Sequence, residues 1–172
     1  MRRQRFAITF VLLLILQILL MNFGNFSQLL SVFFLPVMIL CLPVEQSTVV
    51  RMLIAFAVGF AADFFASGIL GLTSFALVSV AAARNSLVKL VYGQEMFARG
   101  EDISPAKQGL LKLILCTFIV TGLFLALYIW ADGAGMRSFG FSLTKWLVST
   151  AADTAVSIYV GVILTSEGSI WR

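Results

Sequence analysis

The sequence predicts an all-α membrane protein, a polytopic bundle of about six transmembrane helices. Of its 172 residues, 60% are hydrophobic and 12% are charged, whereas a soluble domain is about half apolar and about one quarter charged. The mean hydropathy is +1.03. The apolar runs are also continuous, whereas the strands of a membrane barrel alternate apolar and polar residues over about ten positions. Both observations favour helices that cross lipid.

Six apolar runs approach the length that a bilayer requires, which is about 20 residues for about 30 Å of hydrocarbon. They cover residues 6–21, 28–44, 49–66, 71–91, 109–131 and 142–165. No segment between them reaches the roughly 50 residues of a separate domain, so residues 1–172 are expected to form a single membrane-embedded helical domain. Pro36 predicts a kink in the second run and Pro43 its end. Whether this short run crosses completely is left open.

The basic residues predict that both termini lie in the cytoplasm, because Lys and Arg concentrate on the cytoplasmic side of short loops. With the amino terminus inside, ten of the 12 basic residues lie in or toward the cytoplasmic half, and only Arg137 and Lys145 lie outside. The first run follows a basic start and is not followed by a small-x-small cleavage site, so it is expected to remain as an anchor. The basic residues form no single patch, which argues against nucleic acid.

The chemical inventory predicts a protein that is not an enzyme. There is no histidine, and Cys41 and Cys116 lie in separate apolar runs, so the usual transition-metal sites and a disulfide are not expected. The chain has neither a G-x-S-x-G elbow nor a G-x-x-x-x-G-K-[ST] phosphate loop. A reaction centre in a bilayer needs several polar groups that converge at one depth. We therefore expect no catalytic residues, no cofactor and no small-molecule substrate.

Charged groups at membrane depth need an explanation, because each costs about 2.5–3.5 kcal/mol on insertion scales. Counted along the predicted helices, Arg84 matches Asp153 in depth, and Lys145 matches Asp63. This predicts two ion pairs that fasten the sixth run to the fourth and third runs. Two alternatives stay open. The basic side chains could extend to the interfaces and leave the acids to bond hydroxyl groups, or the carboxylates could belong to a proton or ion relay.

A stripe of small residues runs along the third run between two charged ends. Arg51, Ala55, Gly59 and Asp63 follow one another at intervals of four residues, which places them on one face of a helix. Small residues at this spacing allow two helix backbones to approach closely in lipid. The stripe is therefore expected to pack tightly, either inside the bundle or against a partner protein.

The segment that follows this stripe carries a family resemblance. Gly59-Phe60-Ala61-Ala62-Asp63-Phe64-Phe65-Ala66-Ser67-Gly68-Ile69-Leu70-Gly71-Leu72 resembles the signature region of the rod shape-determining protein MreD family, where a glycine-bearing helix ends in an aspartate and a short turn leads to Gly-Leu and another apolar helix. The whole chain is similar in plan, with Gln17 in the first span. Its charged loop at residues 100–105 looks like that of Bacteroidetes-type members. Thr73-Ser74 departs from the histidine and small residues that many members have there.

The resemblance implies a non-enzymatic scaffold or adaptor subunit of the bacterial elongation (rod) complex, in the cytoplasmic (inner) membrane, that supports cell shape and peptidoglycan synthesis. Its implied partners are MreC above all, RodA with its transpeptidase, and the MreB filament, besides membrane lipid. Candidate residues for partner binding or helix packing are Ala55, Gly59 and Asp63 with the turn through Gly68 and Gly71.

The alternative function is a substrate-binding S-component of an energy-coupling-factor vitamin transporter, because members of the family are similar in fold to such subunits. An S-component is expected to present an Ala-x-x-x-Ala pair in its first helix. The first run, residues 6–21, has one alanine, Ala7, and no such pair.

Overall fold

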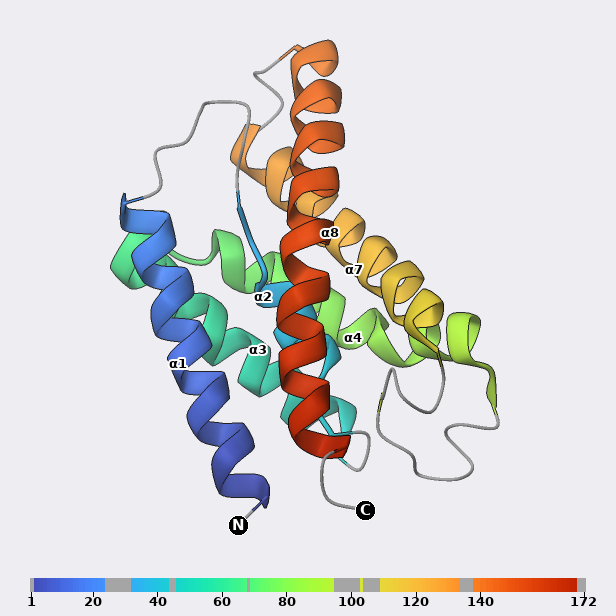
Figure 1. Ribbon diagram of the computed structural model, residues 1–172. Helices are drawn as coiled ribbons and strands as arrows, with labels where there is room; N and C mark the ends of the chain where they lie inside the picture. Colours follow the sequence, from blue (N-terminus) through green and yellow to red (C-terminus); the bar gives the residue numbers. More distant parts are fainter. Residues whose placement is uncertain are drawn as a thin grey trace.

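The computed structural model describes residues 2–23, 32–43, 46–67, 69–94, 103, 109–133 and 138–169. In these residues every regular element is helical (Figure 1). The elements are α1 (Arg2–Phe23), α2 (Leu35–Leu40), α3 (Thr48–Ala62), the π-helical turn η1 (Asp63–Ser67), α4 (Leu72–Tyr92), α7 (Leu110–Gly133) and α8 (Phe139–Ser169). The predicted all-α class is confirmed.

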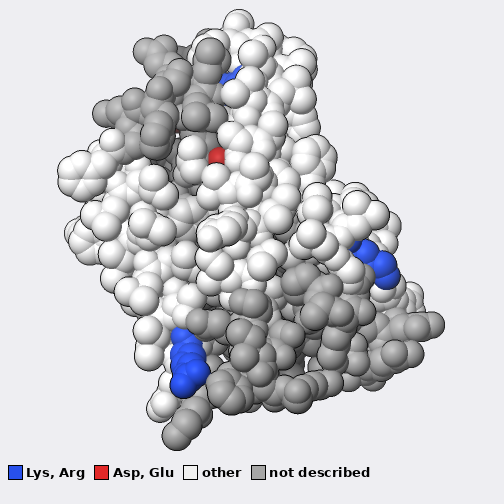
Figure 2. Space-filling model, in the orientation of Figure 1, with Lys and Arg blue, Asp and Glu red and all other residues white. Residues whose placement is uncertain are grey.

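Five of the helices are long and apolar enough to cross a membrane, and they match five of the six predicted runs. These helices cover Gln4–Phe23, Thr48–Ala66, Leu72–Tyr92, Leu110–Gly133 and Phe139–Thr165. Their outward faces carry large exposed hydrophobic side chains, among them Leu53, Leu111 and Trp130. On the face shown in Figure 2, charged side chains are sparse and most of the described surface is uncharged. Such a surface suits lipid and not water, so the chain is a multi-pass membrane protein.

The second predicted run is not a membrane-length helix, and the expectation of a helix over residues 28–44 is corrected. Its regular part is the six-residue helix α2, and residues 32–34 before it are not helical. Pro36 does not kink a longer helix but lies in the first turn of α2. Proline is favoured there, because the first N–H groups of a helix have no partner within it.

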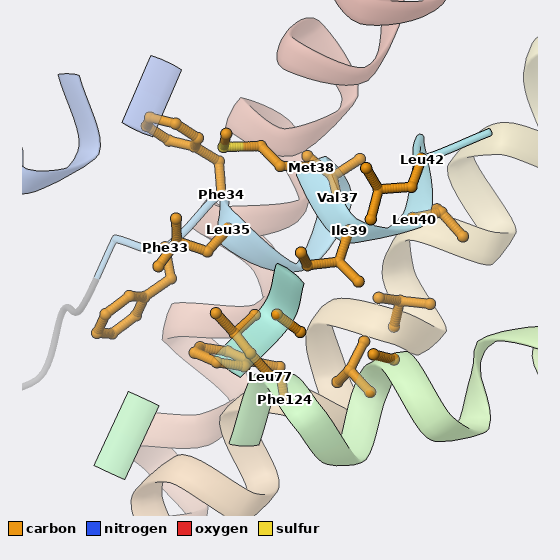
Figure 3. Close-up of a cluster of buried hydrophobic side chains, with 14 of the residues drawn as sticks. Phe33, Phe34, Leu35, Val37, Met38, Ile39, Leu40, Leu42, Leu77 and Phe124 are labelled. Carbon is orange, nitrogen blue, oxygen red and sulfur yellow. The ribbon is translucent and has the colours of Figure 1, made fainter. Parts of the chain in front are cut away.

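The helix α2 lies in the centre of the bundle, where α1, α4, α7 and α8 contact it (Figures 1 and 3). All six of its residues are buried, as are Phe33 and Phe34 before it. The ring of Phe33 packs edge-on against that of Phe124 in α7, with centroids 5.4 Å apart. Gly161 of α8 leaves room for α2, since a Cβ atom on Gly161 would lie 3.3 Å from Cγ2 of Val37. A helix of only six residues therefore occupies the hydrophobic core.

The segment through α2 joins opposite ends of the bundle. In Figure 1 it runs from the end at which α1 finishes toward the end at which α3 begins. The start of α1 and the finish of α8 consequently lie at the same end of the bundle. A short helix flanked by non-helical residues thus takes the place that the sequence assigns to a sixth spanning helix.

The backbones of α3 and α4 approach each other closely at Gly59. A Cβ atom on Gly59 would lie 2.5 Å from Cα and 2.7 Å from the backbone nitrogen of Ser74. Real Cβ atoms do not come so close to backbone atoms, so any side chain at this position requires the two helices to separate.

We expect Gly59→Ala to destabilise the bundle by about 1–3 kcal/mol, the usual cost of an overpacked core. Thermal unfolding of the purified chain in detergent measures the loss. Gly140→Ala is the matched control, because Gly140 also lies in a helix and a Cβ atom there would meet no atom within 4 Å. Equal midpoints for Gly59→Ala and the wild-type chain would show that the two helices are not packed in this way.

Candidate functional site

Asp63 closes the junction between α3 and α4. Its side chain is fully buried. Its Oδ2 atom accepts hydrogen bonds from the backbone N–H groups of Gly71 at 2.9 Å and Ser74 at 3.2 Å, and the N–H of Thr73 lies 3.1 Å from both carboxylate oxygens. These donors belong to the start of α4 and have no partner within the helix. A carboxylate there also interacts favourably with the helix dipole. Asp63 therefore caps α4.

The turn between Asp63 and its donors depends on Gly71. This residue has φ +95°, a left-handed conformation that other residues rarely adopt. Gly68, the other glycine predicted in this turn, lies outside the described residues. On the opposite side, Asn22 of α1 donates through Nδ2 to the carbonyl oxygen of Phe65 at 2.9 Å and to that of Ile18 at 3.2 Å. The turn is thus fixed from two sides.

The small-residue stripe packs inside the molecule. Ala55 and Asp63 are fully buried, Gly59 is buried, and Gly59 faces the backbone of α4. Arg51 at the other end of the stripe is also buried, and its Nη2 atom donates to Thr48 at 3.4 Å. The stripe is thus buried in the bundle, and two of its members, Gly59 and Asp63, contact the backbone of α4.

Arg84 of α4 holds the carboxyl end of α2. Its side chain is 1% exposed. Its Nε atom donates to the carbonyl oxygen of Leu40 at 2.9 Å, and its Nη2 atom donates to that of Leu42. The last carbonyl groups of a helix have no partner within it, and a cation is favoured beside them. Arg84 thus caps α2 as Asp63 caps α4.

Gln17 of α1 holds the other end of this segment. Its Nε2 atom donates to the carbonyl oxygen of Val32 at 2.9 Å, and its Oε1 atom accepts from the backbone N–H of Phe34 at 2.9 Å. One amide thereby pairs with an acceptor and a donor two residues apart, as a neighbouring strand would. Gln17 is fully buried. The sequence marks it as a polar residue in an apolar span but does not reveal its partner.

The structure contains neither of the two predicted ion pairs. Arg84 caps α2, and among the described residues no cation is bonded to either carboxylate oxygen of Asp153, so the predicted pair of Arg84 with Asp153 is wrong. Lys145 pairs instead with Asp132 in the last turn of α7, with Nζ 3.9 Å from Oδ2. The predicted partner of Lys145, Asp63, is bound by the backbone of α4. Matching depths could not reveal these contacts, because backbone groups at helix ends compete for the same side chains.

Three buried polar side chains fix the positions of the helices. Gln17, Asp63 and Arg84 come from three different helices, and each bonds backbone groups at the start or end of another element. Such contacts set the positions of helices relative to one another, because backbone groups in a lipid-covered bundle must be satisfied within the protein.

Asp63→Ala should expose the first turn of α4. A hydrogen bond to a charged group stabilises a protein by about 1.5–3 kcal/mol, so we expect backbone N–H exchange at Thr73 and Ser74 to accelerate about tenfold or more. Hydrogen exchange followed by mass spectrometry on a peptide that covers the start of α4 measures this. A peptide from the middle of α7 serves as the internal reference. Unchanged exchange at the start of α4 would mean that Asp63 does not cap the helix.

Arg84→Met should destabilise the bundle strongly. The change leaves two buried carbonyl groups without their donors, at about 1–3 kcal/mol each, so a loss of about 2–4 kcal/mol in unfolding free energy is expected. Lys89→Met is the matched control in the same helix, since Lys89 is exposed and its replacement should change stability by less than about 0.5 kcal/mol. Equilibrium unfolding in mixed micelles compares the two. Similar losses for both variants would contradict the capping role.

Comparison with known proteins adds no family to this description. No protein-family model, no curated protein and no solved structure matches the chain at a significant level.

Proposed function

We propose that the chain is a non-enzymatic scaffold of the bacterial cell-elongation complex, an adaptor that resembles the MreD family and lies in the cytoplasmic membrane. One observation carries the proposal. In the segment that resembles the family signature, the glycine faces the backbone of α4 and the aspartate caps that helix. These two signature residues therefore hold α3 and α4 together. A subunit that acts through its shape requires residues with such a role.

Both termini are proposed to lie in the cytoplasm. Two observations support this orientation. Ten of the 12 basic residues fall on that side when the amino terminus is inside. The start of α1 and the finish of α8 also share one end of the bundle in Figure 1.

The proposed partner surface is the outer face of α3 and η1. The stripe on the inner face is covered by α4, so it offers no contact area to another protein. On the outer face, Phe56, Phe60 and Phe64 form a stacked row, with successive ring centroids 6.1 and 6.4 Å apart, and all three are exposed. Large aromatic side chains contribute strongly to interfaces. We propose that MreC binds along this row.

Co-purification from native membranes tests the proposal. A tagged chain, extracted in mild detergent, is expected to recover MreC, and the double variant Phe60→Ala with Phe64→Ala should recover about tenfold less, which corresponds to a loss of about 1.4 kcal/mol. Tyr159→Ala is the control, because Tyr159 is also an exposed aromatic residue but lies on α8.

Three outcomes separate the possibilities. Recovery of MreC that depends on the phenylalanine row supports both the function and the surface. Equal recovery of MreC by the wild-type chain and the double variant supports the function and rejects the surface. Recovery of paired ATPases together with a bound vitamin, and of no MreC, would replace the scaffold with the transporter subunit.

A further inference from the structure

A set of buried oxygen atoms lies between α7 and α8. On α8, Thr150, Asp153 and Ser157 are at most 3% exposed, and on α7, Thr117 and Thr121 are fully buried. Separations of three, four and seven residues place the members of each set on one face of their helix. Each helix therefore turns a row of oxygen atoms inward.

Two glycines show where α7 and α8 pack closely on either side of these rows. At one end, a Cβ atom on Gly122 would lie 3.8 Å from Cγ2 of Thr150, and at the other, a Cβ atom on Gly161 would lie 3.8 Å from Cδ2 of Leu113. Thr117, Asp153 and Ser157 fall between these contacts along their helices. The backbone N–H of Phe33, in the segment before α2, also interacts with the Asp153 carboxyl, although not in full hydrogen-bond geometry.

Within the part of the chain that the structure describes, the side-chain oxygen atoms of this set have no partner in full hydrogen-bond geometry. This holds for the hydroxyl groups of Thr117, Thr121, Thr150 and Ser157 and for both carboxylate oxygens of Asp153.

Other hydroxyl groups on the described helices behave differently. Thr154 and Thr165 donate to the carbonyl oxygen four residues earlier at 2.6 Å, and Ser79 and Thr144 do so at 2.9 Å. That bond is available to any helical serine or threonine. In the described residues, the hydroxyl groups of the inward set do not make this bond, so their oxygen atoms remain available to a ligand.

The charge of Asp153 identifies the missing component. A buried carboxylate is costly unless a positive charge or hydrogen bonds compensate it. Among the described residues no cation pairs with Asp153, and the N–H of Phe33, the one backbone donor that acts on its carboxyl, lies outside the geometry of a full hydrogen bond. Every candidate ligand is an oxygen atom, which hard cations prefer. One carboxylate balances one positive charge, so a divalent ion would leave an excess charge in the bundle. A proton alone would neutralise Asp153 but would leave most of the hydroxyl oxygens unmatched.

We propose that Asp153, together with the hydroxyl groups of Thr117, Thr150 and Ser157, binds a monovalent hard cation, Na⁺. The ion would join α7 and α8 at the level where the segment before α2 enters the core. Discontinuous helices in membrane proteins provide such sites, because non-helical backbone and buried polar side chains meet there. The site is independent of the proposed partner and stabilises the bundle itself.

Thermal unfolding of the full chain in detergent tests the site. At constant pH and ionic strength, replacing choline chloride with NaCl is expected to raise the midpoint saturably by about 3 °C or more, as a ligand specific to the folded state does. Asp153→Asn should abolish the Na⁺ dependence. Thr150→Val should raise the Na⁺ concentration at half effect by about tenfold, the factor for about 1.4 kcal/mol.

Thr154→Val is the matched control. Its hydroxyl group bonds its own helix, so the Na⁺ dependence should be that of the wild-type chain. Equal midpoints of the wild-type chain in NaCl and in choline chloride would overturn the proposal and leave Asp153 as a site for a proton or for water. Retained Na⁺ dependence in Asp153→Asn would overturn it too. If Asp153→Asn does not fold, an unchanged Na⁺ response in Thr150→Val with Ser157→Ala is the overturning result.

Discussion

The need to satisfy backbone hydrogen bonds without water governs this bundle. A continuous helix satisfies nearly all of its own N–H and C=O groups, but the interrupted segment through α2 cannot. Gln17 bonds it before α2 begins, and Arg84 bonds it where α2 ends. These contacts let a segment with only six helical residues lie in the core, where α1, α4, α7 and α8 contact it. The hydrophobic core shown in Figure 3 is built around this segment.

The same constraint explains the buried charges. A charge inside a membrane protein is usually expected to meet an opposite charge, yet Asp63 and Arg84 meet backbone groups at helix ends. Each uses its charge where several peptide dipoles converge, which compensates for burial as a partner ion would. Asp153 differs, because in the described residues neither of its carboxylate oxygens has a hydrogen-bond partner within full hydrogen-bond geometry. Asp63 and Arg84 thus differ from Asp153 in their surroundings: the first two bond helix ends, and Asp153 is the proposed cation ligand.

Much of the fold follows from apolar periodicity and length, because a membrane helix needs few side-chain contacts to form. Five runs could be predicted in this way, and the tight packing at Gly59 followed from its spacing within the stripe. The form of the second run could not, since Pro36 is compatible with either a kink or a helix start. The partners of Gln17, Asp63 and Arg84 could not be predicted either. Their partners are backbone atoms, which every residue has, so the sequence does not mark them. Pairing by charge and depth therefore suggested charged side chains as the partners of Asp63 and Arg84.

A double-mutant cycle on Gln17→Leu and Arg84→Met tests most directly whether the two side chains hold one segment. Unfolding free energies of the four chains in mixed micelles are compared. The first variant releases the segment, so the second should then cost less than it does alone, by about 1 kcal/mol or more. Losses that add to within about 0.5 kcal/mol would show two independent sites, and the central role given to the interrupted segment would be contradicted.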